Sequence, residues 1–124
     1  MANILILDDI PDAVVLIQKI LEKKGHRVHG FTDEQEAIAF AAAHPVDLAI
    51  LDIKLKKTSG TEVLEELKKI DSGMHAIMLT GYPTLETARE ALKFGADEYC
   101  VKPIEKDELE EKVAAILKAA SPKV

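Results

Sequence analysis

The sequence has a single cysteine and no long apolar run. Cys100 cannot form a disulfide within the chain, so we expect a protein of the reducing cytoplasm. No apolar run approaches the roughly 20 residues that a membrane-spanning helix requires. The first residues also lack the basic flank and the cleavage pattern of a signal peptide. These absences argue against a disulfide-rich secreted protein and against a protein that spans a membrane.

Composition favours a single folded domain. The chain has 124 residues, of which 48% are hydrophobic and 31% are charged, so a disordered chain is not expected. Sixteen Lys and Arg stand against 22 Asp and Glu, giving a net charge of −6. This acidity argues against a protein that binds nucleic acid directly through its phosphates. We expect one domain over residues 1–120 and a short C-terminal tail over residues 121–124.

Short apolar runs alternate with segments of helical period. Strands are predicted at residues 4–7, 27–31, 46–51, 76–79 and 98–101. Helices are predicted from Pro11 to before Gly25 and over residues 34–43, 61–70, 84–94 and 105–120. Strands this apolar are typical of a parallel sheet that is buried on both faces. The order βαβαβαβαβα therefore predicts an α/β fold, a doubly wound five-stranded parallel sheet flanked by five helices.

Polar side chains follow four of the predicted strands. Asp8 and Asp9 end the first, Asp52 the third, Thr80 the fourth and Lys102 the fifth. In such sheets ligands bind beyond the carboxyl ends of the strands, where the strand order reverses. We therefore expect these side chains at one rim of the sheet.

Three carboxylates at one rim repel each other unless they are protonated or bridged by a cation. Mg²⁺, which prefers oxygen ligands, is the cation that we expect. Asp52 could then act as a nucleophile on phosphorus, with Lys102 as a fixed cation. Simpler interpretations stay open: Asp8 or Asp9 could cap the helix near Pro11, Asp52 could cap the next turn, and Lys102 could be solvated.

At these positions the chain resembles the receiver domains of bacterial two-component response regulators, which share a flavodoxin-like, chemotaxis-regulator-like fold. The resemblance runs from Asn3 to about Ala119. It rests on the acidic pair Asp8-Asp9, Asp52 within Leu-Asp-Ile-Lys, Thr80-Gly81, and the segment Phe94-Gly-Ala-Asp-Glu-Tyr-Cys-Val-Lys-Pro103. The resemblance implies the strand order 2-1-3-4-5.

It also implies a specific chemistry. Asp52 would be the phosphoacceptor and would receive a phosphoryl group from a sensor histidine kinase or a phosphotransfer protein. Asp9 and Asp52 would bind Mg²⁺ directly, together with the backbone carbonyl of Lys54, while Asp8 would act largely through water. Lys102 would contact the phosphoryl group.

The resemblance further implies a switch. Thr80 would move toward the phosphoryl group, and Tyr99 would reorient inward as the aromatic switch residue. The surface of the fourth helix, fifth strand and fifth helix would signal to an output domain or a partner protein. The chain would be a phosphorylation-controlled regulator of phosphorelay signal transduction and not an enzyme with a separate substrate. A phosphorylation-linked homodimer, and whether the chain stands alone or belongs to a longer regulator, stay open.

The chain departs from the family pattern at two positions, and two other classes of protein fit it less well. Ile10 stands directly after the acidic pair, where Glu is common in the family. Lys56 stands where the family often has Pro, and Lys54 and Tyr82 occupy positions that tune the lifetime of the phosphoryl group. An aspartate-nucleophile phosphatase would place a second Asp at position 54. A flavodoxin-like binding module would need a Gly-rich or hydroxyl-rich phosphate loop, but the loop over residues 8–12 holds three Asp and no Gly. The histidines and Cys100 show no spacing that is typical of zinc sites.

Overall fold

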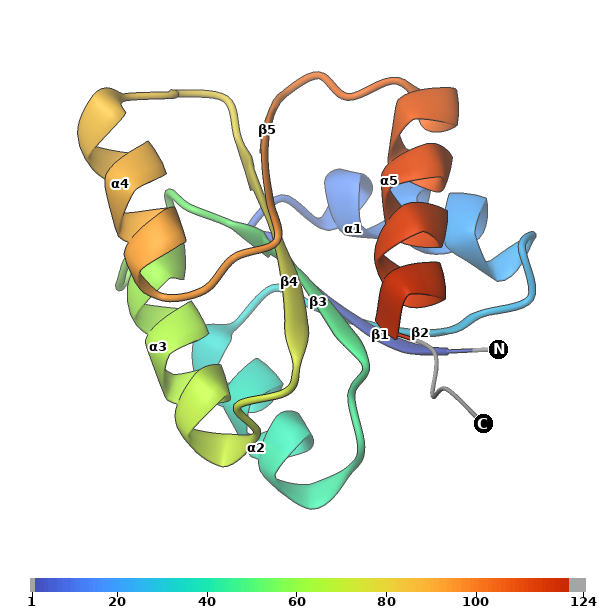
Figure 1. Ribbon diagram of the computed structural model, residues 1–124, viewed down its shortest axis with the longest axis horizontal. Helices are drawn as coiled ribbons and strands as arrows, with labels where there is room; N and C mark the ends of the chain where they lie inside the picture. The colour runs from blue at the N-terminus through green and yellow to red at the C-terminus, as the bar shows by residue number, and fades with distance from the viewer. Residues whose placement is uncertain (1, 121–124) are drawn as a thin grey trace.

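Five short parallel strands form one sheet, and a helix follows each strand (Figure 1). The computed structural model describes residues 2–120. The strands are β1 (Asn3–Leu7), β2 (Arg27–Phe31), β3 (Leu48–Asp52), β4 (His75–Thr80) and β5 (Glu98–Val101). The helices are α1 (Pro11–Glu22), α2 (Glu34–Ala43), α3 (Gly60–Ile70), α4 (Leu85–Lys93) and α5 (Lys106–Ala120). The predicted fold class and element order are confirmed, with boundaries that differ by one or two residues. The predicted tail lies outside the described residues.

The strand order is β2-β1-β3-β4-β5, as predicted. Leu7 of β1 pairs with Phe31 of β2 on one side and with Leu51 of β3 on the other. From β1 the chain therefore crosses to one edge of the sheet, and from β3 it proceeds toward the other edge. The strand order therefore reverses between β1 and β3, and in sheets of this kind ligands bind beyond the carboxyl ends of the strands at that point.

The sheet separates two apolar layers. Alternate residues of β1 face opposite sides, Leu5 and Leu7 toward α2, α3 and α4, and Ile4 and Ile6 toward α1 and α5. Because both faces are covered, the strands read as continuous apolar runs in the sequence. Cys100 is buried in the layer beneath α1 and α5, as expected for a small apolar residue.

The start of α1 corrects one simple interpretation of the acidic pair. The N-cap residue is Ile10, and no side chain caps the helix. Pro11 occupies the first turn, where its missing N–H leaves one donor fewer to satisfy. Neither Asp8 nor Asp9 therefore serves as the helix cap, so the position of these carboxylates needs another explanation.

Helix α4 is loosely attached to the rest of the fold. Ala91 is its only buried residue. Leu85 and Leu92, which recur at helical spacing in the sequence, are 68% and 76% exposed. These two leucines therefore face solvent instead of the core. Nowhere in residues 2–120 is a helix long and apolar enough to span a membrane.

Candidate functional site

Three carboxylates meet where β1 and β3 end. The pairing of Leu7 with Leu51 brings Asp8 beside Asp52, and Asp9 follows directly. One ligand oxygen from each of the three lies within 4.8 Å of the others. Asp8 and Asp52 are only 2% and 7% exposed, whereas Asp9 is half-buried. The structure thus brings together the three carboxylates that the sequence singled out.

Lys102 supplies the cation of this cluster. Its Nζ lies 2.5 Å from Asp8 Oδ2 and 3.4 Å from Asp52 Oδ2. Its backbone N–H donates to the carbonyl of Thr80 at 2.7 Å, which fixes the residue just beyond β5. The peptide bond between Lys102 and Pro103, whose isomer the sequence left open, is cis. The side chain therefore bridges the ends of three strands.

Burial and charge oppose each other in the cluster. Burial, followed by the negative charge of Asp8, raises the pKa of Asp52, and the ammonium of Lys102 only partly offsets this. Burial alone would lower the pKa of Lys102. The hydrogen bond to Asp8 and the charges of Asp52 and Asp8 outweigh it, so the pKa of Lys102 is raised. Lys102 is thus held in its charged form, and the cluster keeps an excess of negative charge.

Backbone amides of the following loops orient the side chains at the strand ends. Each side chain accepts the N–H of the residue two positions later: Asp8 from Ile10 at 3.0 Å, Asp52 from Lys54 at 3.4 Å, and Thr80 from Tyr82 at 3.0 Å. The Lys54 ammonium also lies 4.5 Å from the centroid of the Tyr82 ring. This contact joins the loop after Asp52 to the loop after Thr80. The Lys54 carbonyl stays a predicted ligand.

Gly60 is a site residue that the sequence analysis missed. A Cβ at this position would lie 2.0 Å from the carbonyl oxygen of Asp52. The Gly60 N–H donates to the carbonyl of Ile53 at 2.7 Å, so α3 begins directly against the end of β3. A glycine in the first turn of a helix, where it is an unfavourable residue, was the available signal.

Thr80 and Tyr99 lie beside the cluster on one face of the sheet. Thr80 pairs with Val101, and Met78 pairs with Tyr99, so the two residues are diagonal neighbours on adjacent strands. Thr80 is buried, and Tyr99 is half-buried. The Tyr99 hydroxyl bonds to Oγ1 of Thr87 in α4 at 2.7 Å, a partner that the sequence analysis did not identify.

The donors of the cluster fit a hard divalent cation. Within residues 2–120, Asp8, Asp9 and Asp52 are the one group of three or more acidic, His or Cys residues whose ligand atoms lie this close together. Carboxylate oxygens suit Mg²⁺, which keeps several water ligands and is commonly held by few carboxylates. Mg²⁺ at this position remains a prediction.

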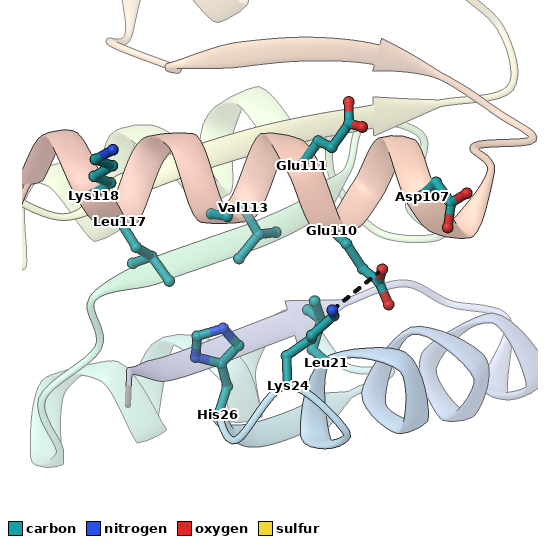
Figure 2. A pocket seen from close by; sticks show the side chains of 10 residues that line it. Leu21, Lys24, His26, Asp107, Glu110, Glu111, Val113, Leu117 and Lys118 are labelled. Atoms are coloured by element: carbon teal, nitrogen blue, oxygen red, sulfur yellow. Dashed lines mark ion pairs between the residues drawn. The ribbon is translucent and has the colours of Figure 1, made fainter.

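The groove between α1 and α5 is separate from the carboxylate cluster. It encloses about 680 Å³, and Figure 2 shows the Lys24–Glu110 ion pair, at 3.8 Å, joining its two walls. The ring of His26 points into it, and burial lowers the pKa of this histidine. None of the predicted site residues lines this groove.

A smaller apolar groove borders the cluster. It encloses about 380 Å³ between α1 and the segment that leads into α5. Lys102 and Pro103 form one end, and Leu16 and Ile17 of α1 line the other wall. Leu16 is largely exposed, so apolar surface is open to solvent next to the Lys102 side chain.

Comparison with known proteins gives one family. Residues 4–114 match the family model described as the response regulator receiver domain. The heme response regulator HssR of Staphylococcus saprophyticus is 33% identical over 118 residues, which cover 95% of this chain and 52% of HssR. The alkaline phosphatase synthesis transcriptional regulatory protein PhoP of Bacillus subtilis is 35% identical over 94% of this chain and 48% of its own length. The chain therefore spans about half the length of these curated relatives.

Solved structures agree with this result. The CheY-like response regulator receiver domain protein of Methanospirillum hungatei is 38% identical with a TM-score of 0.91, over 97% of this chain and 96% of that one. A response regulator receiver domain protein of Clostridium thermocellum is 33% identical with a TM-score of 0.88, over 96% of both chains. The likeness thus covers nearly the whole chain on both sides.

Proposed function

Since this chain belongs to the response regulator receiver domain family, we propose that it accepts a phosphoryl group on Asp52 and signals through α4, β5 and α5. The observation that carries this proposal is the geometry of the carboxylate cluster. A buried carboxylate, Asp52, lies within reach of two further carboxylates and of one fixed ammonium, Lys102. That combination supplies a nucleophile, ligands for a cation and a partner for a phosphoryl oxygen.

Asp52 acts as the nucleophile. One of its oxygens forms a bond to phosphorus while the bond from phosphorus to the donor's nitrogen or oxygen breaks, and the leaving group takes up a proton from solvent. Its other contacts hold the carboxylate in place, because the Lys54 N–H donates to Oδ1 and Lys102 lies beside Oδ2. Hydrolysis of the aspartyl phosphate later restores Asp52.

Charge neutralisation is divided between the chain and a cation. Mg²⁺ bound by Asp8, Asp9 and Asp52 would offset the negative charge that the phosphoryl oxygens add. Lys102 is already held at the cluster in its charged form, so a phosphoryl oxygen can replace a carboxylate as its partner. Asp8 and Asp9 follow β1, which pairs with β3, so a cation bound to them would lie beside the acceptor Asp52.

The phosphoryl group then acts on Thr80. A phosphoaspartate adds acceptor oxygens and negative charge, and the Thr80 hydroxyl can donate to one of these oxygens by turning toward Asp52. Tyr99 lies on the same sheet face and follows that movement, which alters the surface of α4, β5 and α5. Exposed Leu85 and Leu92 offer this surface to an output domain, a partner protein or a second copy of the chain.

The phosphodonor approaches from the other side of the cluster. The apolar groove beside Lys102 and the exposed side chains of Ile10 and Leu16 would receive a histidine kinase or a phosphotransfer protein. A donor placed there brings its phosphoryl group to the strand ends without crossing α4. The chain is accordingly a regulator that takes part in its own phosphorylation, and we place it in the cytoplasm.

Intact-mass analysis after incubation with acetyl phosphate tests the proposal. We expect the wild type to gain one phosphoryl group only when Mg²⁺ is present, and Asp52→Asn to gain none. Asp12→Asn is the matched control, because Asp12 is exposed in the first turn of α1 and should leave the gain unchanged. Equal gains in the wild type and Asp52→Asn would disprove Asp52 as the acceptor, and a gain without Mg²⁺ would disprove the role of the cation.

A further inference from the structure

The hydroxyl of Tyr99 is tied to the first turn of α4. It lies 2.7 Å from Oγ1 of Thr87, the third residue of the helix. Thr87 has a second set of partners, because it forms a capping box with Thr84 at the start of α4. One threonine hydroxyl therefore belongs both to the contact with β5 and to the cap of α4.

The hydrogen bonds around Thr87 use the full capacity of its hydroxyl. A hydroxyl donates one hydrogen and accepts at two lone pairs. The Thr87 Oγ1 is placed to donate to the Thr84 carbonyl at 3.1 Å and to accept the Thr84 N–H at 3.3 Å. One acceptor position then remains, and two hydroxyls compete for it, Tyr99 Oη at 2.7 Å and Thr84 Oγ1 at 3.0 Å. The Tyr99 hydroxyl is the partner that comes from β5, so loss of its bond leaves Thr87 with partners from Thr84 alone.

Little else holds this end of α4. Ala91, in its second half, is its only buried residue, and Leu85 at its start is largely exposed. The N-terminal turn therefore depends on its capping hydrogen bonds more than a well-packed helix does. A substitution of Thr87 should therefore destabilise this turn before it affects the rest of α4.

We propose that Thr87 is a positioning residue that couples the orientation of Tyr99 to the N-terminal cap of α4. While the bond is present, Tyr99 and the first turn of α4 hold each other in the arrangement described. When Tyr99 turns away, Thr87 loses its partner on β5, and the first turn of α4 loosens. The step that turns Tyr99 rests on the function proposed above, whereas the coupling between Tyr99 and α4 belongs to the unphosphorylated chain.

Hydrogen–deuterium exchange of the α4 amides tests the coupling in the full chain. Four variants are compared with the wild type: Thr87→Val, Thr87→Ser, Tyr99→Phe, and Thr87→Val with Tyr99→Phe. A single hydrogen bond corresponds to about a threefold to tenfold change in an opening equilibrium. We expect exchange in the first turn of α4 to accelerate by that factor in Tyr99→Phe and by at least that factor in Thr87→Val. Thr87→Ser, which keeps the hydroxyl, should exchange like the wild type.

The double variant distinguishes coupling from two separate effects. If the two hydroxyls act through one bond, Tyr99→Phe adds no further acceleration once Thr87 is Val. Wild-type exchange in Tyr99→Phe, or effects of the two substitutions that multiply in the double variant, would overturn the proposal. Tyr99→Phe keeps the aromatic ring and the capping box, so its result does not depend on whether Thr87→Val folds well.

The same samples separate this proposal from the proposed function. Intact mass after treatment with acetyl phosphate and Mg²⁺ reports phosphorylation, and all four variants should gain a phosphoryl group as the wild type does. A wild type that gains none would disprove the function, while the exchange comparison without phosphodonor would still decide the coupling. In the phosphorylated wild type, unchanged exchange at the start of α4 would overturn the role of Thr87 in the switch.

Discussion

The ammonium of Lys102 lies 3.4 Å from Oδ2 of Asp52 and 2.5 Å from Oδ2 of Asp8. One cation therefore serves two buried carboxylates, which come from strands that are neighbours in the sheet but distant in the sequence. The cluster as a whole is short of positive charge, and the raised pKa of Asp52, caused mainly by burial and then by Asp8, reflects this shortage. Substitutions in this cluster and in the loops around it should therefore have distinct and measurable effects.

Lys102→Met removes the cation and keeps the length of the side chain. We expect phosphoryl uptake from acetyl phosphate to slow by about a hundredfold, the usual effect of removing one charged or hydrogen-bonding group at a reacting centre. Intact mass followed over time measures the rate. Lys112→Met is the control, because the Lys112 ammonium bonds to Glu98 at 2.9 Å, away from the cluster. Equal rates for Lys102→Met and the wild type would contradict the role given to Lys102.

Asp52→Asn should change stability with a defined pH dependence. The pKa of Asp52 is raised in the folded state. The folded state therefore keeps the proton on Asp52 at pH values where the unfolded state has lost it. The free energy of unfolding of the wild type therefore falls as the pH rises through that interval. We expect Asp52→Asn to be more stable than the wild type at neutral pH.

The gain should shrink as the pH falls to 3.8, the ordinary pKa of an aspartate, and then below it, because Asp52 becomes protonated in the unfolded chain as well as in the folded one. Urea unfolding at several pH values measures the difference. Asp12→Asn, at an exposed position, controls for the loss of one negative charge. A stability gain that is constant over this pH range would show that ionisation of Asp52 is not its cause.

The contact between Lys54 and Tyr82 should shield the phosphoryl group from water. The two side chains meet above loops whose backbone amides hold Asp52 and Thr80. We expect Tyr82→Ala to shorten the lifetime of the phosphoryl group severalfold, and Tyr82→Phe, which keeps the ring, to preserve it. Because an exposed cation–π contact contributes about 0.5–1 kcal/mol at most, the unfolding free energy should change little. Decay of the phosphorylated mass after removal of the donor gives the lifetime, and equal decay in Tyr82→Ala and the wild type would refute shielding.

Gly60→Ala should disturb both stability and the site. The added Cβ would lie 2.0 Å from the Asp52 carbonyl oxygen, a backbone atom that cannot move without displacing the acceptor. We expect a loss of about 3 kcal/mol or more in the free energy of unfolding. Gly81→Ala is the matched control, since a Cβ there meets nothing within 4 Å and should change stability by less than about 0.5 kcal/mol. Similar losses of unfolding free energy in both variants would show that the close approach of α3 to β3 is not the cause of the loss.

The sheet was predictable from the sequence because its strands are buried on both faces. Such strands appear as continuous apolar runs, and residues that follow them must gather at one rim once the strands are parallel. The pattern of strand ends therefore suffices to group Asp8, Asp52 and Lys102. Hydrophobic periodicity predicted the helix α4 but not the direction in which its leucines point. Leu85 and Leu92 recur at helical spacing, and this spacing is the same whether they face the core or, as here, solvent.

Other features depend on contacts that no sequence pattern encodes. The bond between Tyr99 and Thr87 requires particular side-chain rotamers on two elements, and neither residue type indicates its partner. The close approach of Gly60 to Asp52 depends on how α3 meets β3. The acidic pair next to Pro11 was compatible with a helix cap, and only the backbone conformation at Ile10 excludes it.

The division of the helices between the two sheet faces has a consequence for binding order. Helices α1 and α5 pack on one face of the sheet and α2, α3 and α4 on the other (Figure 1). Asp8 and Asp52 lie at the ends of the central strands β1 and β3, between these two layers. A donor in the groove beside α1 would also contact Ile104 and Leu109, which lie before and within α5 on the same sheet face. A receiver of the signal that extends onto α5 would therefore come close to the donor, whereas a receiver that contacts α4 alone would lie on the other face. For a receiver confined to α4, the donor need not leave first, and the duration of the signal would be set by the chemistry at Asp52.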